Sequence, residues 1–332
     1  MVKKMKKIYA FEVRKDEEQF LLELGKKNGV EVECSSRLLT LEKIPELEEG
    51  SAVTVLGMNR YGEEEMRALS KRDIRYLSTR TIGYNHIDLE AAKQCGVHVC
   101  NADYAPNGVA DYTVMMILLC LRNYKQALWR MQVNDFSLPG LMGREMKDLT
   151  IGIVGTGRIG TQVLKNLSGF GCRLLCYGKH PNKEAAALAE YVSLEELYRE
   201  SDVISLHLAL TPETRHIINR ESLAQMKDGV VLINCARGEL MDVQTLIEGI
   251  EQEKIGALGL DTVEEEEGIV HRNLKTDIFA DRDIAYLRQF KNVVYTYHMA
   301  FYTDAAVKSM AECGIEGILQ MEQKGTCGTQ LC

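Results

Sequence analysis

The sequence predicts an α/β protein with two doubly wound parallel sheets, each flanked by helices. Short apolar runs alternate with amphipathic helical patterns along nearly the whole chain, which is typical of parallel strand–helix units. Some of these runs are apolar at every position, as expected for strands that are buried on both faces. The alternation is interrupted once, in a polar stretch that holds Pro139, Gly140 and Gly143, and then starts again. A chain of 332 residues with such an interruption is expected to form about two domains.

The first series of elements is expected to form one sheet. Helices are predicted where apolar residues recur at helical spacing, and two of these helices end at a glycine, Gly29 or Gly96. The expected strands are Ile8–Val13, Val30–Cys34, Ala52–Leu56, Ile74–Ser78 and Val97–Cys100. The expected helices are Glu17–Asn28, Glu63–Ser70 and Leu89–Cys95.

The second series follows the turn residues Pro106–Gly108 and begins with one long apolar helix, Val109–Val133. Runs of strand formers then recur between polar and helical segments. The expected strands are Thr150–Val154, Arg173–Tyr177, Val203–His207, Val230–Asn234, Ala257–Leu260 and Val293–Tyr295. A helix at Arg158–Ser168 joins the first two of these strands, and a last helix is expected at Asp304–Lys324.

Composition and charge exclude several classes of protein. The chain is 45% apolar and 27% charged, which are globular values and exclude a disordered, collagen-like or coiled-coil chain. Its 40 basic and 48 acidic residues give a net charge of −8, so we expect no nucleic-acid partner. The longest apolar run, Val114–Leu121, is far shorter than the ~20 residues that span a bilayer, so we expect no membrane insertion.

The cysteines and the N-terminal residues indicate the cellular compartment. No apolar signal-peptide core follows the basic stretch Lys3–Lys7, so we expect a cytoplasmic protein. None of the 10 cysteines forms a C-x-x-C pair, and we expect them to be small residues of a reducing cell. Cys172 and Cys176 would share one face of a strand, but structural zinc sites use more ligands, and no metal site is expected.

The strongest motif is a glycine-rich loop with the spacing G-x-G-x-x-G between an expected strand and an expected helix. Gly155 would make the tight turn, Gly157 would let a pyrophosphate approach the backbone, and Gly160 would pack the helix on the strand. The helix N-terminus would offer N–H groups and a positive dipole end to the pyrophosphate. The alternative is a glycine-rich turn that binds no ligand. The loop consists of Gly155, Thr156, Gly157, Arg158, Ile159 and Gly160.

The segment after the next strand bears on which dinucleotide binds. An Asp or Glu there would bind the ribose hydroxyls of NAD, but this chain has Gly178, Lys179 and His180. Without the carboxylate nothing repels a 2′-phosphate, and Lys179 or His180 could pair with it. We therefore favour NADP(H) over NAD(H). The alternative is that Lys179 is a surface residue and that NAD binds less tightly.

Three further segments follow strands of the second series, which is where ligands bind in doubly wound sheets. They hold Arg237, then Asp261 with Glu266, and then His298. Taken singly, Arg237 could cap a helix, Glu266 could be a solvated charge and His298 could be a core histidine. Behind a dinucleotide loop, the three together form a chemically complete catalytic set.

These motifs together resemble the D-isomer-specific 2-hydroxyacid dehydrogenase family over nearly the whole chain, from about Ile8 to Lys324. Within that family the chain is most similar to the D-lactate dehydrogenase branch, which includes the vancomycin-resistance type, and to aromatic D-2-hydroxyacid dehydrogenases of anaerobic bacteria. The segments that carry the resemblance are the glycine loop, Met226–Gly229, Asn234–Gly238, Asp261 with Glu266, His298, Thr79–Asp88, Tyr104–Asn107 and Ala300–Thr303.

The resemblance implies two Rossmann-like domains with a cleft between them that holds the active site. Residues 1–103 and 299–332 would form a flavodoxin-like substrate-binding domain, and residues 104–298 would form an NAD(P)-binding Rossmann domain. The resemblance also implies a homodimer built largely through the nucleotide domain, and a cleft whose closure excludes water from the hydride path.

The resemblance further implies the NAD(P)H-dependent, reversible reduction of a 2-keto acid to the D-2-hydroxy acid. Hydride from nicotinamide C4 would reach C2 of the substrate, and His298 would protonate the forming alkoxide as a general acid. Glu266 would pair with His298 and favour its protonated form. Arg237 would polarise the keto oxygen and hold the carboxylate.

Other residues would bind the substrate and the cofactor. The backbone N–H groups of Ile82 and Gly83 would bind the substrate carboxylate, and Tyr104, Phe301 and Tyr302 would line the site. Specificity is expected at these three aromatic residues and near Leu56–Arg60. Besides the glycine loop, the cofactor would contact Gly178, Lys179, His207, Cys235, Ala236 and Asp261.

The chain departs from the family pattern in two places. Tyr297 stands where a proline usually precedes the catalytic histidine, which would alter how His298 is presented. Gly178 stands where the carboxylate for the ribose usually lies, which puts the preference for NAD in doubt.

The sequence leaves the substrate and one other class of function open. We favour pyruvate, reduced to D-lactate, over phenylpyruvate or 2-ketoisocaproate. Aromatic residues near the site would either pack a large substrate side chain or fill the space beside the methyl group of pyruvate. The other class is a non-catalytic NAD(H)-sensing corepressor. Such a protein would keep the glycine loop but would not need Glu266 and His298.

Overall fold

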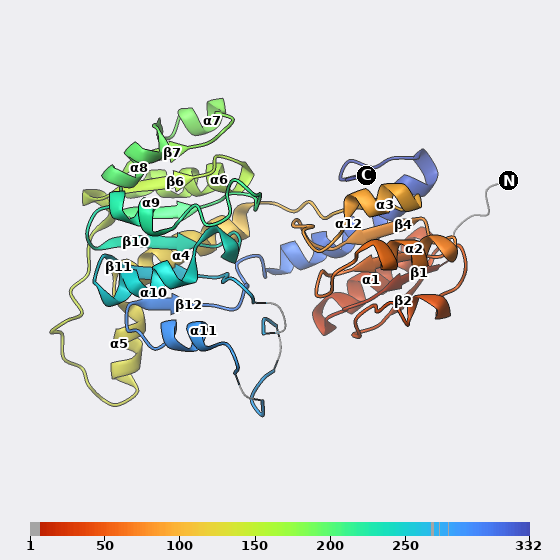
Figure 1. Ribbon diagram of the computed structural model, residues 1–332, viewed down its shortest axis with the longest axis horizontal. Helices are drawn as coiled ribbons and strands as arrows, with labels where there is room; N and C mark the ends of the chain where they lie inside the picture. Colours follow the sequence, from red (N-terminus) through yellow and green to blue (C-terminus); the bar gives the residue numbers. More distant parts are fainter. Residues whose placement is uncertain (1–6, 267–268, 272, 278) are drawn as a thin grey trace. The chain divides into compact units, whose positions relative to one another are not determined.

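The computed structural model describes residues 7–266, 269–271, 273–277 and 279–332, and the chain divides into two compact units (Figure 1). We call Met1–Ala105 with Tyr302–Cys332 the terminal unit, and Pro106–Phe301 the central unit. Each unit is a parallel sheet with helices on both faces, so the predicted fold class is confirmed. Among the described residues, no helix is both long and apolar enough to cross a membrane.

The terminal unit contains a five-stranded parallel sheet in the order β2-β1-β3-β4-β5, which is the order of flavodoxin-like folds. Its strands are β1 (Lys7–Ala10), β2 (Glu31–Cys34), β3 (Ala52–Val55), β4 (Tyr76–Thr79) and β5 (His98–Cys100). Its helices are α1 (Lys15–Asn28), η1 (Ile44–Glu46), α2 (Glu63–Lys71), α3 (Leu89–Cys95) and α12 (Asp304–Lys324).

Apolar side chains cover both faces of this sheet. On one face, Leu21 of α1 and Ile315 of α12 pack in a core with Ile8 of β1. On the other face, Met66 of α2 and Ala92 of α3 belong to a second core. Helix α12 therefore returns from the far end of the chain to complete one face of a sheet that the N-terminal residues build.

The central unit contains a seven-stranded parallel sheet in the order β12-β11-β10-β9-β6-β7-β8. The strand order reverses between β6 and β9, and ligands of doubly wound sheets bind at such a switch point. The strands are β6 (Thr150–Val154), β7 (Arg173–Tyr177), β8 (Glu190–Tyr191), β9 (Val203–Leu206), β10 (Val230–Asn234), β11 (Ile255–Leu260) and β12 (Val293–Tyr295). The helices are α4 (Asn107–Leu121), α5 (Tyr124–Met131), η2 (Met146–Asp148), α6 (Arg158–Leu167), η3 (Ser168–Phe170), α7 (Lys183–Ala186), α8 (Leu194–Glu200), α9 (Arg220–Gln225), η4 (Gly238–Leu240), α10 (Val243–Glu251) and α11 (Arg282–Leu287).

Two apolar cores enclose the central sheet. Helices α4 and α6 contribute Ile117 and Leu164 to the core on one face. Helices α8 to α11 contribute residues such as Leu197 and Leu246 to the core on the other face. All five residues of β10 are buried, which matches the prediction of strands buried on both faces.

The prediction of a single helix over Val109–Val133 is wrong. Helix α4 ends at Leu121, and the separate helix α5 starts at Tyr124. Asn123 between them has a φ of 51°, a left-handed conformation that no helix interior allows and that asparagine tolerates better than most residues. The Asn123 side-chain amide donates a hydrogen bond to the carbonyl of Met142 at 3.0 Å, which holds this corner in place.

Candidate active site

The glycine loop leaves the carboxyl end of β6, next to the switch point of the central sheet. Gly155 has a φ of 105°, which only glycine adopts readily, and its N–H donates to the carbonyl of Tyr177 at 2.8 Å. A Cβ on Gly160 would lie 1.9 Å from the Gly155 carbonyl oxygen, so helix α6 packs on the turn too closely for a side chain. A Cβ on Gly157 would meet nothing within 4 Å, so the loop is open at this point.

Helix α6 starts directly after this opening. Its N-cap residue is Gly157, and no side chain caps its first N–H groups. Uncapped N–H groups at a helix N-terminus, with the dipole behind them, suit a phosphate group. An open glycine in front of such a terminus is the arrangement that a dinucleotide pyrophosphate requires, so the residues present fit this cofactor.

The segment after β7 has no room for the carboxylate that would bind the ribose of NAD there. A Cβ on Gly178 would lie 2.2 Å from Oγ1 of Thr156, so no larger residue fits here unless Thr156 moves. Lys179 and His180 follow and are both exposed. The Thr211 hydroxyl and, more weakly, the charge of Lys179 lower the pKa of Glu213.

His207, directly after β9, lies against the glycine loop. A Cβ on Gly155 would come 2.4 Å from the His207 carbonyl oxygen, and a Cβ on Gly160 would come 3.4 Å from the His207 Cβ. The Ser205 hydroxyl lies 2.9 Å from Nε2 of His207. Its Nδ1 is buried and has no hydrogen-bond partner among the described residues. Burial lowers the pKa of His207 to about 4, so the ring is neutral at neutral pH.

A tight turn after β10 presents Arg237. The fully buried Asn234 accepts the N–H of Ala236 at 3.0 Å and donates to the carbonyl of Arg237 at 2.8 Å. The Arg237 guanidinium itself donates to the Ala236 carbonyl at 2.7 Å, and the side chain is half-buried. Burial raises the pKa of the neighbouring Cys235, which therefore stays a thiol.

Asp261, at the end of β11, holds the segment that carries His298. Its carboxylate is fully buried and accepts hydrogen bonds from the Thr296 hydroxyl at 2.5 Å and from the N–H groups of Met299 and Ala300 at 3.0 and 2.9 Å. Its carbonyl accepts the N–H of His298 at 2.7 Å. These four bonds hold His298 at a φ of 53°, a left-handed conformation. Asp261 thus holds the chain on both sides of the histidine.

His298 and Glu266 form a direct pair. Nδ1 of His298 lies 2.5 Å from Oε1 of Glu266, so the carboxylate accepts the Nδ1 proton and orients the ring. The His298 side chain is 30% exposed, so its ring is open to solvent. The His271 ring donates to the His298 carbonyl at 3.0 Å, and the Phe301 ring packs edge-on at a centroid distance of 6.2 Å. A carboxylate that orients the ring and an imidazole that stays accessible together suit proton transfer.

The residues expected to bind the substrate carboxylate belong to the terminal unit. The N–H of Ala102 donates to the Thr81 carbonyl at 3.0 Å, and the Asn101 side chain donates to the Ile82 carbonyl at 2.7 Å. In a trans peptide the N–H points away from the C=O, so the N–H groups of Ile82 and Gly83 both face away from these donors. Backbone N–H groups are donors that suit a carboxylate.

The remaining predicted residues lie in these same two units. Tyr104 is half-buried in the terminal unit, and Tyr302 is 48% exposed there with the Arg14 guanidinium 5.4 Å from its ring centroid. The predicted cofactor residues and Arg237, Glu266, His298 and Phe301 all lie in the central unit. The sequence reasoning named neither Asn101 nor the turn-forming role of Asn234. Asn234 had a signal, because asparagine at the end of a buried strand is a turn former.

A family model, full-length relatives and solved structures match this chain. The model of the D-isomer specific 2-hydroxyacid dehydrogenase, NAD binding domain, matches residues 114–300. An aromatic 2-oxoacid reductase of Clostridium sporogenes is 41% identical over 98% of each chain. A D-lactate dehydrogenase of Escherichia coli is 35% identical over 98% of this chain and 99% of its own. The solved structure of a D-2-hydroxyisocaproate dehydrogenase superposes with a TM-score of 0.88 at 30% identity, covering 98% and 99% of the two chains.

Proposed function

Because the chain belongs to the D-isomer-specific 2-hydroxyacid dehydrogenase family, we propose that it reduces a 2-keto acid to the D-2-hydroxy acid with a nicotinamide cofactor. The observation that carries the proposal is the pair of His298 and Glu266 in the same unit as the glycine loop and Arg237. A non-catalytic corepressor that senses the cofactor would not need an oriented, accessible imidazole. This pair therefore favours an enzyme over a corepressor.

The chain's own residues would act on the substrate in defined roles. The bound cofactor supplies the hydride that C2 of the substrate accepts. His298 donates the proton on Nε2 to the oxygen on C2, since Glu266 holds the proton on Nδ1. Glu266 keeps its hydrogen bond to Nδ1 and so holds the ring in orientation during this transfer. Arg237 binds the carboxylate and polarises the keto oxygen, and the N–H groups of Ile82 and Gly83 bind the carboxylate.

We propose that the 2-keto acid is pyruvate. The alternative is an aromatic 2-keto acid such as phenylpyruvate. Pyruvate is supported by the D-lactate dehydrogenases among the relatives and solved structures. The aromatic substrate is supported by the higher identity to a 2-oxoacid reductase of that class. Phe301, whose ring packs beside that of His298, is proposed to contact either side chain. Tyr104 and Tyr302 stay predicted substrate contacts.

The first experiment is an absorbance assay of the purified protein. It would follow the reduced nicotinamide in NADH and in NADPH with pyruvate, phenylpyruvate, 2-ketoisocaproate and 2-ketoglutarate, and chiral chromatography would identify the product. One dominant 2-keto acid and a D product would support the proposal. Binding of the cofactor without turnover of any 2-keto acid would contradict it and favour the corepressor.

For the cofactor we propose NADP(H) in preference to NAD(H). The support is Gly178, where a carboxylate would have to displace Thr156, and the exposed cations Lys179 and His180 beside it. Gly178→Asp is expected to lower kcat/KM for NADPH about tenfold relative to that for NADH, because the new carboxylate repels a 2′-phosphate. Gly178→Ala is the matched control, since it adds the same Cβ without the charge. A wild-type preference for NADH would contradict the proposal.

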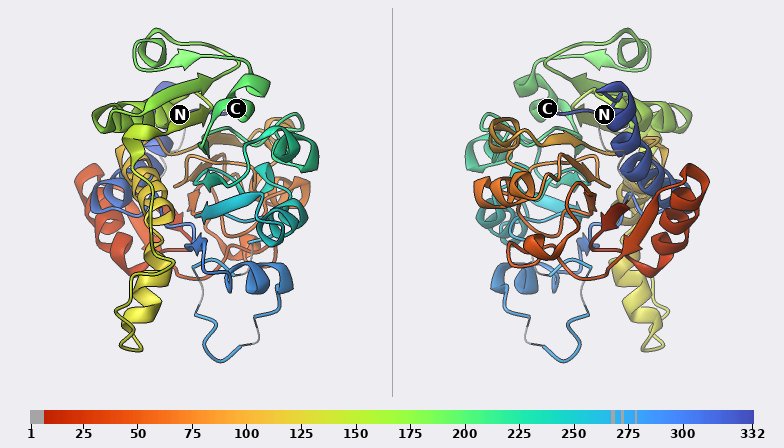
Figure 2. Two further views of the ribbon diagram at one scale, coloured as in Figure 1. Left: turned by 90° about the vertical axis from the view of Figure 1, so that its left-hand side faces the viewer. Right: turned by 90° about the vertical axis from the view of Figure 1, so that its right-hand side faces the viewer.

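We also propose a homodimer, assembled through residues 124–143 of the central unit, which we call the arm. The arm consists of α5 and the loop after it, and it projects from the rest of its unit (Figure 2). The Arg130 guanidinium donates to the carbonyls of Pro139 and Ser137 at 2.8 and 3.3 Å, so the arm has a fixed shape. Seven large apolar side chains on it are each at least 50% exposed: Tyr124, Trp129, Met131, Val133, Phe136, Leu138 and Met142. A patch of this kind on a folded protein marks an interface, and a second copy of the chain would cover it.

A cytoplasmic location remains part of the proposal. None of the ten cysteines is paired in a disulfide. Unpaired cysteines in this number suit a reducing compartment.

A further inference from the structure

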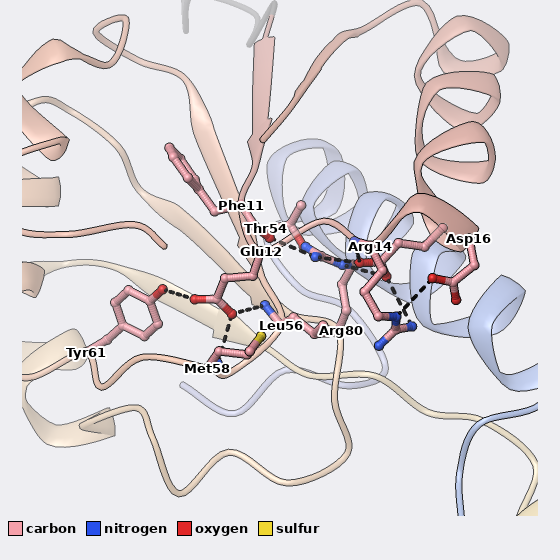
Figure 3. Close-up of polar contacts among 10 residues, drawn as sticks. Phe11, Glu12, Arg14, Asp16, Thr54, Leu56, Met58, Tyr61 and Arg80 are labelled. Carbon is pink, nitrogen blue, oxygen red and sulfur yellow. Dashed lines mark hydrogen bonds and ion pairs between the residues drawn. The ribbon is translucent and has the colours of Figure 1, made fainter. Parts of the chain in front are cut away.

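A buried carboxylate at the end of β1 holds a loop of the terminal unit from behind. Glu12 is 3% exposed. Its Oε2 accepts the N–H groups of Leu56 and Met58, both at 2.9 Å, and its Oε1 accepts the hydroxyl of Tyr61 at 2.8 Å (Figure 3). All three donors come from the segment that joins β3 to α2. One side chain thus fixes both ends of the Leu56–Arg60 loop.

The conformation of Glu12 indicates that this contact is specific. Its φ is 60°, in the left-handed region that glutamate rarely adopts, and its N–H donates to the Arg37 carbonyl at 3.0 Å. Burial of an ionised carboxylate is unfavourable unless hydrogen-bond donors meet it, and three donors do so here. Tyr61 is 1% exposed, and burial together with the nearby charge of Glu12 raises the pKa of its phenol, which therefore stays a donor.

The contacts continue from this loop to the segment that carries Ile82 and Gly83. The N–H of Tyr61 donates to the His86 carbonyl at 2.8 Å. Gly57 has a φ of 90° and faces the His86 ring so closely that a Cβ would lie 2.9 Å from the ring carbon Cε1. The loop and His86 are therefore packed as one block.

His86 is joined to Gly83 by hydroxyl groups. Nε2 of His86 lies 3.1 Å from the Thr79 hydroxyl, which lies 2.8 Å from the Thr81 hydroxyl. The Thr81 hydroxyl in turn donates to the Gly83 carbonyl at 2.6 Å. An unbroken series of contacts thus connects Glu12 with the backbone whose N–H groups we assign to the substrate carboxylate.

We propose that Glu12 is a positioning residue that fixes the Leu56–Arg60 loop and, through His86, the Ile82–Gly83 segment, and thereby sets the affinity and size preference for the 2-keto acid. The proposal rests on the proposed function, because that function assigns the loop to the substrate side chain and the segment to its carboxylate. Glu12 touches neither the substrate nor the cofactor in this proposal. Its effect is therefore expected in KM for the 2-keto acid, with little change in kcat or in cofactor affinity.

Two variants of Glu12 test its hydrogen bonds separately from its charge and from its left-handed backbone conformation. Glu12→Gln keeps the length of the side chain, since its carbonyl oxygen can accept both N–H groups and its amide can donate to the Tyr61 oxygen. Glu12→Asn keeps a residue that tolerates the left-handed conformation but withdraws the acceptor by one methylene. Glu65→Gln is the matched control, because it weakens a similar bond, to the N–H of Gly62 at 2.9 Å, outside the loop.

The assay measures kcat and KM for pyruvate and phenylpyruvate and the Kd of the reduced cofactor. Glu12→Gln and Glu65→Gln are expected to stay within about threefold of wild type in every constant. Glu12→Asn is expected to raise KM for the 2-keto acids about tenfold, the scale of one lost buried hydrogen bond, and to change the ratio of kcat/KM between the two substrates. A Glu12→Asn protein with a lower melting temperature but unchanged KM values and ratio would overturn the proposal.

Hydrogen exchange provides a readout that does not depend on turnover. Glu12→Asn is expected to speed amide exchange both in residues 56–61 and in residues 81–86, and faster exchange in the first segment alone would contradict the coupling. Tyr61→Phe, which removes only the hydroxyl contact, gives the same test if Glu12→Asn fails to fold. A wild-type protein that reduces no 2-keto acid would contradict the proposed function, while the exchange experiment would still decide the coupling through Glu12.

Discussion

At the scale of single residues, the backbone around His298 sets how the proposed general acid is presented. Tyr297 precedes it where the family pattern leads us to expect a proline, so no proline ring restricts the backbone before the histidine. Instead, Asp261 accepts three backbone N–H groups, those of His298, Met299 and Ala300, and the side-chain hydroxyl of Thr296 before them. The substitution at 297 therefore changes the sequence pattern while leaving the imidazole paired with Glu266.

His298→Ala is expected to lower kcat by about 10²–10⁴-fold, which is the usual effect of losing a general acid. The Kd of the reduced cofactor should stay near the wild-type value, because the glycine loop does not involve this side chain. Steady-state kinetics and cofactor fluorescence would check the two expectations. His98→Ala, at an exposed histidine of the terminal unit, is the control. Wild-type turnover by the His298 variant would refute the assigned role.

His207 predicts a pH dependence of stability. Because burial lowers its pKa from the ordinary value of 6.5 to about 4, the unfolded chain binds a proton more readily than the folded one between these values. His207 therefore reduces stability as pH falls from about 6.5 to 4, and its effect is constant above this range. Melting temperatures of wild type and His207→Asn across this range would check it. The variant should lose less stability on acidification, and parallel curves would disprove the expectation.

Site residues could be predicted from sequence only where the chemistry is local. The pattern of strands predicted where the glycine loop, Arg237 and His298 lie, because each comes shortly after a strand. Glu12 and Tyr61 meet across 49 positions of the chain, and no spacing rule connects them. Nothing in the sequence pattern indicates a left-handed glutamate, because that conformation is imposed by tertiary contacts.

At the scale of elements, α12 packs on the sheet of the terminal unit too closely for a side chain at one position. Gly314 lies where the helix crosses the sheet, and the Ser78 hydroxyl donates to its carbonyl at 2.7 Å. A Cβ at this position would lie 2.8 Å from Cγ of Arg80, whose buried side chain is fixed by an ion pair with Glu17 at 3.2 Å. Arg80 therefore cannot move away to make room for a larger residue at position 314.

Gly314→Ala is thus expected to destabilise the protein by about 1–3 kcal/mol through overpacking. Helix propensity alone predicts the opposite sign, a gain of about 0.5–1 kcal/mol. Gly169→Ala is the matched control, because a Cβ there would meet nothing within 4 Å. Chemical denaturation of the three proteins would measure both effects. A stabilised Gly314 variant would show that Arg80 can shift after all.

The break between α4 and α5 illustrates what the periodic pattern cannot give. Apolar residues continue through the break, so the pattern predicts one helix. The turn at Asn123 depends on its contact with Met142, which lies 19 positions further along the chain, at the far end of the arm, and outside the window of a local pattern. The existence of α4 was therefore predicted, while its C-terminal boundary depended on tertiary structure.

At the scale of the whole molecule, the arm predicts the oligomeric state. Wild type is expected to run as a dimer in size-exclusion chromatography with light scattering, because two copies would bury the apolar side chains of both arms. Phe136→Ser combined with Leu138→Ser is expected to give a monomer. Phe170→Ser, at an exposed apolar residue outside the arm, is the control. A monomeric wild type would rule out the dimer.

The two-unit organisation could be predicted because both sheets repeat the same strand–helix alternation on either side of a polar interruption. The strand orders could not be read from the pattern, since every parallel order uses the same buried strands. They followed from the resemblance and not from the periodicity of the residues.

The terminal unit is built from both ends of the chain, and this constrains the order in which the protein folds during synthesis. Helix α12 covers Ile8, Ala10 and Ala52, yet it is synthesised after the whole central unit. At ~5–20 residues per second, that apolar surface waits roughly 10–40 s for its cover, long enough for aggregation or for capture by a chaperone. The central unit would therefore be complete before the terminal unit, although synthesis of the terminal unit starts first.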